Sequence, residues 1–128
     1  MRSLGIGVEG FFIVGFPGET SEQVKRTLAY IRRLNLDAHY LYYATPYPGT
    51  ELYYISKKHN YIINNFSYKS LEPRRIHIET PLLPAEKLRR LVRRHNIIMQ
   101  WRMLWRHPIR ETPLVFAKLL RDFKQKVL

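Results

Sequence analysis

The first apolar segment of the chain covers residues 8–16, which are nearly free of charge and rich in β-branched and aromatic side chains. This run is short and lacks the period of an amphipathic helix, so it favours a strand that is buried on both faces. Pro17 and Gly18 follow it and end the strand in a turn. We therefore predict a strand of the type found in parallel sheets.

An amphipathic helix is predicted directly after this turn. Thr20 and Gln23 have the spacing of a capping box, in which each side chain bonds to the backbone N–H of the other residue. Apolar residues then recur three or four positions apart, with basic residues opposite them; the apolar ones are Val24, Leu28, Ile31 and Leu34. Asn35 tolerates the left-handed conformation that often ends a helix, so we expect the helix to stop there.

A second strand is predicted over residues 37–44, which are dense in tyrosine. A stiff loop with two prolines and a glycine follows at residues 45–50, and a short helix is expected over residues 51–58. Strand, helix and strand in this order form a right-handed parallel βαβ unit. Both strands of such a unit end at the same edge of the sheet, so the two loops that follow them are expected to lie side by side.

The remainder of the chain is predicted to be mainly helical. Residues 60–83 look irregular, with a short strand expected at residues 76–78, and a helix is predicted from residue 84 until Pro108 breaks it. A further helix is expected to begin at residues 112–113, where a threonine precedes a proline. The first of these helices has arginines on one side and an apolar face on the other, formed by Leu88, Leu91, Val92, His95, Ile98 and Met99.

Composition indicates a folded protein of one domain at most. The chain has 128 residues, of which 45% are hydrophobic and 25% charged, and it contains no cysteine. The missing cysteines exclude disulfides, a cysteine nucleophile and any iron–sulfur cluster bound by this chain's own thiolates. The apolar run at residues 11–16 is far too short to span a bilayer, and residues 1–5 do not resemble a signal peptide. We therefore expect a cytoplasmic protein, either free in the cytoplasm or peripheral to the membrane.

The net charge of +12 is concentrated in the second half of the chain. Residues 1–73 carry eight basic and six acidic side chains, whereas residues 74–128 carry fourteen basic and four acidic ones. A basic half of this kind suits a nucleic acid, an anionic lipid surface or an acidic protein partner. A solvated helix face with no partner explains the same charges equally well.

The turn after the first strand contains the residues that chemistry could use. Gly15 would let a ligand approach the backbone closely, and Gly18 can adopt a positive φ without strain. Glu19 precedes a helix, where a negative charge is favoured. In parallel α/β folds, ligands bind at this end of the strands. An ordinary turn between a strand and a helix would use the same residue types, so the turn alone does not establish a site.

Two segments together, residues 10–20 and residues 43–52, resemble the radical S-adenosylmethionine enzymes. The likeness is greatest to the branch with a cobalamin-binding domain, which includes proteins like the anaerobic magnesium-protoporphyrin monomethyl ester cyclase. The first segment, the capped helix and the strand that ends in Thr-Pro-Tyr-Pro-Gly-Thr look like the fifth and sixth strands of their barrel. The resemblance covers residues 4–62 well and residues 81–128 loosely.

This resemblance implies an α/β fold, a partial parallel (βα) barrel of the radical S-adenosylmethionine type followed by an α-helical C-terminal extension. The corresponding regions would be residues 1–62 for the last barrel strands and helices, 63–83 for an irregular connector, and 84–128 for a basic helical extension. In the family, the pattern that closes the adenosylmethionine site maps onto Ile13, Gly15, Gly18 and Glu19. Ile13 would pack on the adenine, and Tyr43, Ala44 and Thr45 would offer backbone groups to its edge. Phe11 replaces an early glycine of the fuller family pattern, which would either narrow the pocket or be a habit of this branch of the family.

The family's cluster-binding cysteines precede the part that this chain resembles. A [4Fe-4S] cluster, and cobalamin if the parent enzyme uses it, would therefore come only through a missing N-terminal portion. The resemblance implies a C-terminal fragment that is inactive alone and has the missing half of the barrel as its partner. The alternative is a non-catalytic basic module that binds nucleic acid or an anionic membrane surface through residues 84–128.

Isolated polar and aromatic residues carry weaker signals. The five histidines have no partners at metal-ligand spacing, so we predict no metal site. His39 is the exception to follow, because it lies on a strand with one side toward the interior of the implied barrel. Tyr40, Tyr42, Tyr43 and Tyr47 are expected to serve packing. Trp101 and Trp105 stand beside arginines, and core packing is expected of them before a membrane or nucleic-acid contact.

Overall fold

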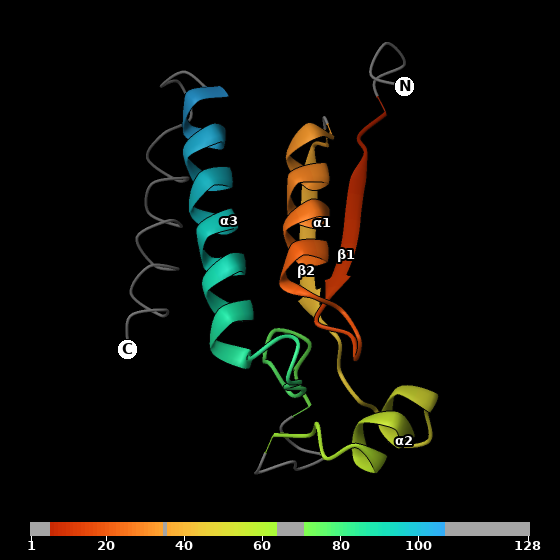
Figure 1. Cartoon of the computed structure of the whole chain (residues 1–128). Coiled ribbons are helices and arrows are strands. Elements are labelled where there is room, and N and C mark those ends of the chain that lie inside the picture. The colour runs from red at the N-terminus through yellow and green to blue at the C-terminus, as the bar shows by residue number, and fades with distance from the viewer. Residues whose placement is uncertain (1–5, 35, 64–70, 107–128) are drawn as a thin grey trace. The chain divides into compact units, whose positions relative to one another are not determined.

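The computed structural model describes residues 6–34, 36–63 and 71–106, without the side chains of residues 103–106. Within this part, the protein is a small α/β structure with two parallel strands and three helices (Figure 1). The elements in chain order are β1 (Glu9–Val14), α1 (Ser21–Arg33), β2 (Ala38–Tyr43), α2 (Glu51–Lys58) and α3 (Ala85–Arg106). The predictions for Asn35, for Pro108 and for the helix from residue 112 lie outside the described residues.

The two strands pair in parallel, as the βαβ prediction requires. Glu9 pairs with Ala38 at one end of the register and Val14 with Tyr43 at the other. The backbone N–H of Ala44 donates to the carbonyl of Val14 at 2.9 Å, which continues the ladder beyond the last strand pair. The predicted strands and their order are confirmed, and their predicted bounds are one or two residues too wide at the ends.

Helix α1 begins where the capping box predicted. The side chain of Thr20 accepts from the backbone N–H of Gln23, and the backbone N–H of Thr20 donates to the Gln23 side chain at 2.7 Å. Two of the donors that a helix start leaves open are thereby satisfied. At the other end, Leu34 caps the helix in an extended conformation, and its N–H donates to the carbonyl of Tyr30.

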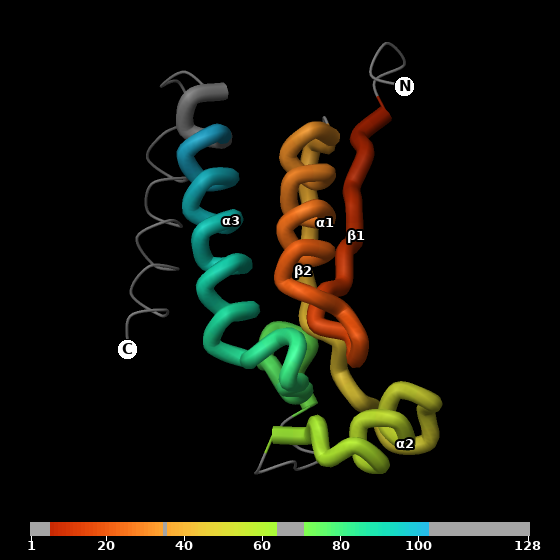
Figure 2. The backbone as a smooth tube through the Cα atoms, viewed as in Figure 1, coloured from red at the N-terminus to blue at the C-terminus, as the bar shows by residue number. Residues whose placement is uncertain are grey.

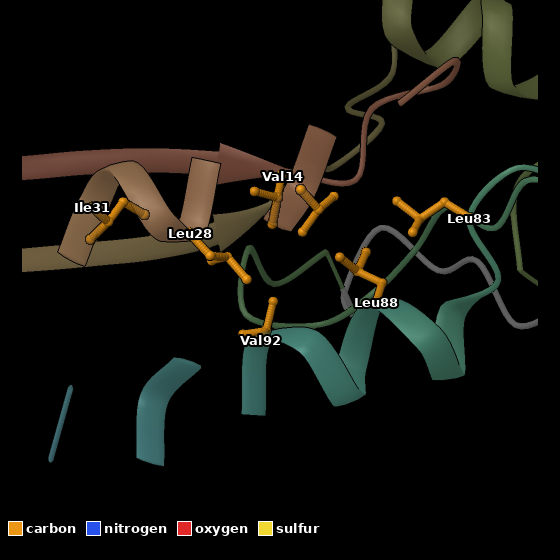
Figure 3. Packing of buried hydrophobic residues seen from close by; sticks show 7 residues of the cluster. Val14, Leu28, Ile31, Leu83, Leu88 and Val92 are labelled. Atoms are coloured by element: carbon orange, nitrogen blue, oxygen red, sulfur yellow. The ribbon is translucent and has the colours of Figure 1, made fainter. Parts of the chain in front are cut away.

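Helix α1 and the first turns of α3 lie on one side of the two-stranded sheet (Figure 2). The hydrophobic core fills the space between these helices and the sheet (Figure 3). Its buried members come from β1, α1, the segment before α3, and α3: Val14, Val24, Leu28, Ile31, Leu83, Leu88 and Val92. Burying each of these aliphatic side chains contributes about 1.5–3 kcal/mol. The apolar stripes that were predicted for α1 and for the first turns of α3 are therefore the surfaces that pack in this core.

The prediction that the first strand is buried on both faces is wrong for this chain. Side chains along β1 alternate, so that Val14 is fully buried while Phe11 and Ile13 are 66% and 52% exposed. Successive residues of a strand point to opposite faces. The described helices cover the face that carries Val14, and the face of Phe11 and Ile13 stays open to solvent in the described part of the chain.

The connector between α2 and α3 is held by a few backbone contacts. Ile62 and Ile78 form an antiparallel bridge, flanked by a hydrogen bond from the Glu79 N–H to the Tyr61 carbonyl at 2.8 Å. The predicted strand at residues 76–78 is thus reduced to a single bridge. The carboxylate of Glu79 also accepts from the N–H of Ala85 at 3.2 Å, which satisfies an open donor at the start of α3.

The chain divides into two compact units, Met1–His95 and Asn96–Leu128, and the boundary falls within α3. The core and the strand ends all belong to the first unit. In the second unit, Ile97 and Trp101 are exposed, which contradicts the expectation that Trp101 packs in a core. None of the helices in the described ranges is long and apolar enough to cross a membrane.

Candidate functional site

The structure brings the two motif segments to the same edge of the sheet. The strands are parallel and their last residues, Val14 and Tyr43, are register partners. The turn at residues 15–19 and the loop at residues 44–50 therefore leave the sheet side by side. This is the edge at which parallel α/β folds bind ligands.

Glu19 closes the first of these turns upon itself. One of its carboxylate oxygens, Oε2, accepts from the N–H groups of Gly15 at 2.6 Å and Phe16 at 3.2 Å. The N–H of Glu19 in turn donates to the carbonyl of Phe16 at 3.0 Å. Hydrogen bonds to a charged acceptor contribute about 1.5–3 kcal/mol each, so the side chain holds the shape of the turn.

Gly15 is required both by its backbone and by its surroundings. Its φ is +89°, a conformation that side-chain-bearing residues rarely adopt, and a Cβ placed there would lie 2.8 Å from Cδ2 of Leu88. The sequence suggested that a ligand approaches this glycine closely. Leu88 of α3 lies on the side of this glycine where a Cβ would be, and the approach of a ligand to its backbone stays a prediction. Gly18 has a φ of +86° with open space around it, as its predicted role requires.

The second loop is partly buried and internally bonded. Ala44 and Thr45 are 3% and 8% exposed, and the Thr45 hydroxyl donates to the Tyr43 carbonyl at 3.1 Å. The N–H of Tyr43 donates to the carbonyl of Pro73 at 2.8 Å. This bond occupies the N–H group of Tyr43, and the bond to the Val14 carbonyl occupies that of Ala44. Each carbonyl oxygen has two lone pairs, so the carbonyls of Tyr43 and Thr45 keep acceptor capacity beyond the bonds they make.

The open face of the sheet carries an aromatic and aliphatic surface next to these turns. Phe11 of β1 stacks on Tyr40 of β2 with ring centroids 4.9 Å apart and planes inclined by 17°. Ile13 lies on the same side of β1, and its register partner is Tyr42. Flat apolar rings pack well on surfaces of this composition.

Tyr43 points to the opposite side, into the core beneath α1. Burial raises the pKa of its phenol, and the nearby guanidinium of Arg89 opposes this effect. The phenol therefore stays protonated at neutral pH. Its partial burial, and the ring stacking of Tyr40, fit the expectation that these tyrosines serve packing.

His39 lies on the side of β2 that faces the helices. It alternates with Tyr40 and lies on the same side as Leu41 and Tyr43, which pack against the core. Its ring meets the ring of His95 edge to face, with centroids 5.5 Å apart. His39 therefore lies on the side of β2 that would face outward in a barrel, because the helices of such a barrel lie outside its strands.

The contact between the buried His95 and the half-buried His39 is the feature that the sequence pattern did not reveal. His95 was expected on the apolar face of α3, but nothing in the pattern indicated that His39 and Arg32 would meet it. The only signal was a histidine within an otherwise aliphatic stripe. Within the described residues, no group of three or more potential ligand side chains could hold a metal ion.

Comparison with known proteins gives partial matches to enzymes. The chain is 35% identical over 74 residues to an uncharacterized methyltransferase of Pyrococcus horikoshii, a match that covers 56% of this chain and 16% of that protein. It is 42% identical over 45 residues to the tRNA-2-methylthio-N(6)-dimethylallyladenosine synthase of Hydrogenovibrio crunogenus, which covers 35% of this chain and 9% of the synthase. The same synthase of Buchnera aphidicola is 44% identical over 45 residues.

The chain thus spans less than a fifth of the length of the curated relatives it matches. No protein-family model matches the chain. No solved structure matches it either. What the comparisons establish is a partial similarity to a methyltransferase and to enzymes that modify tRNA.

Proposed function

We propose that this chain forms part of a radical S-adenosylmethionine enzyme and contributes the adenine side of its S-adenosylmethionine site. The observation that carries the proposal is the pair of turns, at residues 15–19 and 44–50, placed side by side at the carboxyl ends of two parallel strands. The partial similarity to a methyltransferase and to methylthio-transferring synthases supports it, because both names describe the transfer of a methyl-bearing group.

The residues at this edge fit an adenine ring. The exposed side chain of Ile13 offers an apolar surface for one face of the ring. The carbonyls of Tyr43 and Thr45 can accept from its amino group. Glu19 and the glycines Gly15 and Gly18 fix the course of the turn beside it. Phe11, which is exposed beside Ile13, narrows the space that remains.

The rest of the cofactor apparatus belongs outside this chain. S-adenosylmethionine supplies a methyl group or, when reduced at a [4Fe-4S] cluster, a radical. The chain has no cysteine, so the cluster is assigned to a separate N-terminal portion of the parent enzyme, as is cobalamin if the parent uses it. The role of residues 13–19 and 43–45 is to bind and orient the nucleoside.

The open face of the sheet supports the barrel assignment. Phe11, Ile13 and Tyr40 are 37–66% exposed, and together they form an apolar surface on the side away from α1. In a (βα) barrel this side of each strand faces the packed interior, and the helices lie outside. We assign the part of this surface formed by Phe11 and Tyr40 to contact with the missing N-terminal half of the barrel, and Ile13 at its end to the adenine; that half is then the principal partner of this chain.

Amide NMR of the full chain with added S-adenosylmethionine tests the proposal. We expect shifts confined to the two turns, above all at Gly15, Gly18, Ala44 and Thr45. Ile13→Ala removes the apolar surface under the ring and should weaken binding about tenfold, equivalent to about 1.4 kcal/mol. Tyr54→Ala is the matched control, since Tyr54 is 62% exposed on α2 and has no role in the proposed site.

Two results would contradict this proposal. One is the absence of shifts at millimolar S-adenosylmethionine in a chain whose spectrum shows the folded βαβ unit. The other is equal weakening of binding by the Ile13 and Tyr54 substitutions.

A second candidate function rests on the exposed side of α3. Five basic side chains lie there, opposite the buried Leu88 and Val92: Lys87, Arg89, Arg90, Arg93 and Arg94. The acidic residue in the same turns, Glu86, pairs with Arg89 at 2.6 Å. Four of the five are arginines, whose planar guanidinium groups bind phosphates through two parallel hydrogen bonds. We propose that this basic face of α3 binds the phosphate backbone of a nucleic acid.

Nucleic acid is preferred over a membrane for this face because a helix that lies in a membrane inserts apolar side chains. In the first turns of α3 those side chains are buried in the protein core. The synthases named above act on tRNA, which makes RNA the first nucleic acid to test. An anionic membrane surface is the competing outcome.

A further inference from the structure

A cluster of three nitrogen-bearing side chains joins three elements of the first unit. His95 of α3 is 1% exposed. Its Nδ1 lies 3.4 Å from Nη1 of Arg32 in α1. Its ring stands edge to face with the ring of His39 in β2, with planes inclined by 87°. The cluster therefore lies where the helix layer meets the sheet.

The hydrogen bond fixes the protonation state of His95. A guanidinium group can only donate, so Nδ1 of His95 must accept the bond from Arg32. The ring proton then belongs on Nε2, and this buried nitrogen has no hydrogen-bond partner among the described residues. The neutral ring is thus the form that fits the site.

A proton added to His95 would have to occupy Nδ1. It would turn the acceptor for Arg32 into a second donor that points at the same guanidinium. The groups that face His95 from the other elements are Arg32 on α1 and His39 on β2, and both disfavour a further positive charge. A buried cation without an opposite charge is costly, so the site would have to open.

The pKa of His95 agrees with this geometry. Burial first, then His39 and Arg32, lower the pKa of His95 from 6.5 to about 4. Burial also lowers the pKa of His39. A histidine whose pKa is lower in the folded than in the unfolded state binds protons preferentially in the unfolded state. Its stabilising effect is complete above pH 6.5 and is lost as the pH falls toward 4.

We propose that His95 is a proton-operated latch: its neutral ring seats α3 against α1 and β2, and its protonation releases α3 from them. Leu88, on the same helix, lies against Gly15 in the turn of the candidate site. Release of α3 withdraws this side chain and loosens the turn. The effect on the turn as a ligand site rests on the proposed function, whereas the latch itself does not.

Hydrogen exchange of the full chain, corrected for intrinsic rates, tests the latch without any ligand. With pKa values of about 4 and 6.5, the opening constant of α3 should rise about 20-fold between pH 7 and pH 5. The amides of residues 88–95 should lose protection by that factor. His95→Leu keeps the site filled but cannot take a proton there, so most of the loss of protection should disappear and only the contribution of His39 should remain.

A matched control is His59→Gln, because His59 is exposed at the end of α2 and stacks on Tyr61 outside the cluster. This variant should follow the wild-type pH dependence. Constant protection of α3 in the wild type from pH 7 to pH 4.5 would overturn the proposal, as would an unchanged pH dependence in His95→Leu. If that variant does not fold, an NMR titration of the wild-type ring decides, and a pKa of 6 or above for His95 rules the latch out.

Discussion

At the scale of single residues, Gly15 and Glu19 are the positions that fix the shape of the turn at the proposed ligand site. The Glu19 carboxylate binds the N–H groups of Gly15 and Phe16, and Leu88 fills the space beside Gly15. Both interactions hold the turn in one shape before any ligand arrives. A site that is fixed in advance loses less entropy when a ligand binds.

The two glycines of this turn should differ in their tolerance of a side chain. In Gly18→Ala the new side chain has free space, and only the unfavourable positive φ lowers the free energy of unfolding, by about 1–2 kcal/mol. Gly15→Ala meets a similar φ and also places its Cβ against Leu88, so we expect a loss of about 3–5 kcal/mol in the free energy of unfolding. Urea unfolding of both variants measures this difference.

Leu88→Ala tests whether the clash with Leu88 causes the larger loss of stability in Gly15→Ala. In a double-mutant cycle with Gly15→Ala, the loss should be smaller than the sum of the two single losses, because the truncated side chain leaves room for the new methyl group. Equal costs for the two glycine variants would show that Leu88 does not constrain the turn.

At the scale of elements, local signals were sufficient for the helices but not for the faces of the strands. The capping box at Thr20 and the period of α1 lie within a few residues, and the sequence predicted both. Which face of a strand is buried depends on what covers it and on the register, and a shift of one residue exchanges the faces. The exposure of Ile13 and the helix-facing side of His39 therefore needed the structure.

The basic face of α3 gives the prediction at this scale. Arg90→Glu together with Arg94→Glu should weaken binding of the full chain to RNA at least tenfold at low salt and reduce the salt dependence of the binding constant. Fluorescence anisotropy at several salt concentrations measures both effects. Glu51→Gln on α2 is the control, because it alters an exposed charge outside the basic face.

The competing outcomes are distinct in this experiment. If the chain binds anionic vesicles but not RNA, the basic face of α3 is a membrane-binding surface. RNA binding that does not respond to salt, or that survives both arginine substitutions, would show that this face is not the nucleic-acid surface.

At the scale of the whole molecule, the open face of the sheet should make the isolated chain associate. Phe11 and Ile13 expose apolar surface, and the segment around them is uncharged and free of proline, a composition that favours pairing with another chain. We expect oligomers in sedimentation velocity runs whose proportion rises with protein concentration. Phe11→Lys should shift the chain to monomers, whereas Tyr54→Lys on α2 should not.

A monomer at high concentration with a sharp thermal transition would contradict this expectation. It would mean that part of the chain outside the described residues covers the sheet. The sequence alone predicted an apolar strand at this position, but not that one of its faces would lack cover. Whether a face of the strand is covered depends on the elements that pack against it, and the sequence of the strand does not specify those elements.

The contact between Leu88 and Gly15 also has a consequence for the order of events during protein synthesis. The turn leaves the ribosome well before the helix segment that backs it. At about 5–20 residues per second, the interval is several seconds. During this time β1 is complete and lacks the part of its cover that α3 supplies, and distant contacts of this kind form slowly because a long loop must close first. The apolar segment of β1 is therefore exposed early in synthesis, when chaperones that bind extended apolar peptides can reach it.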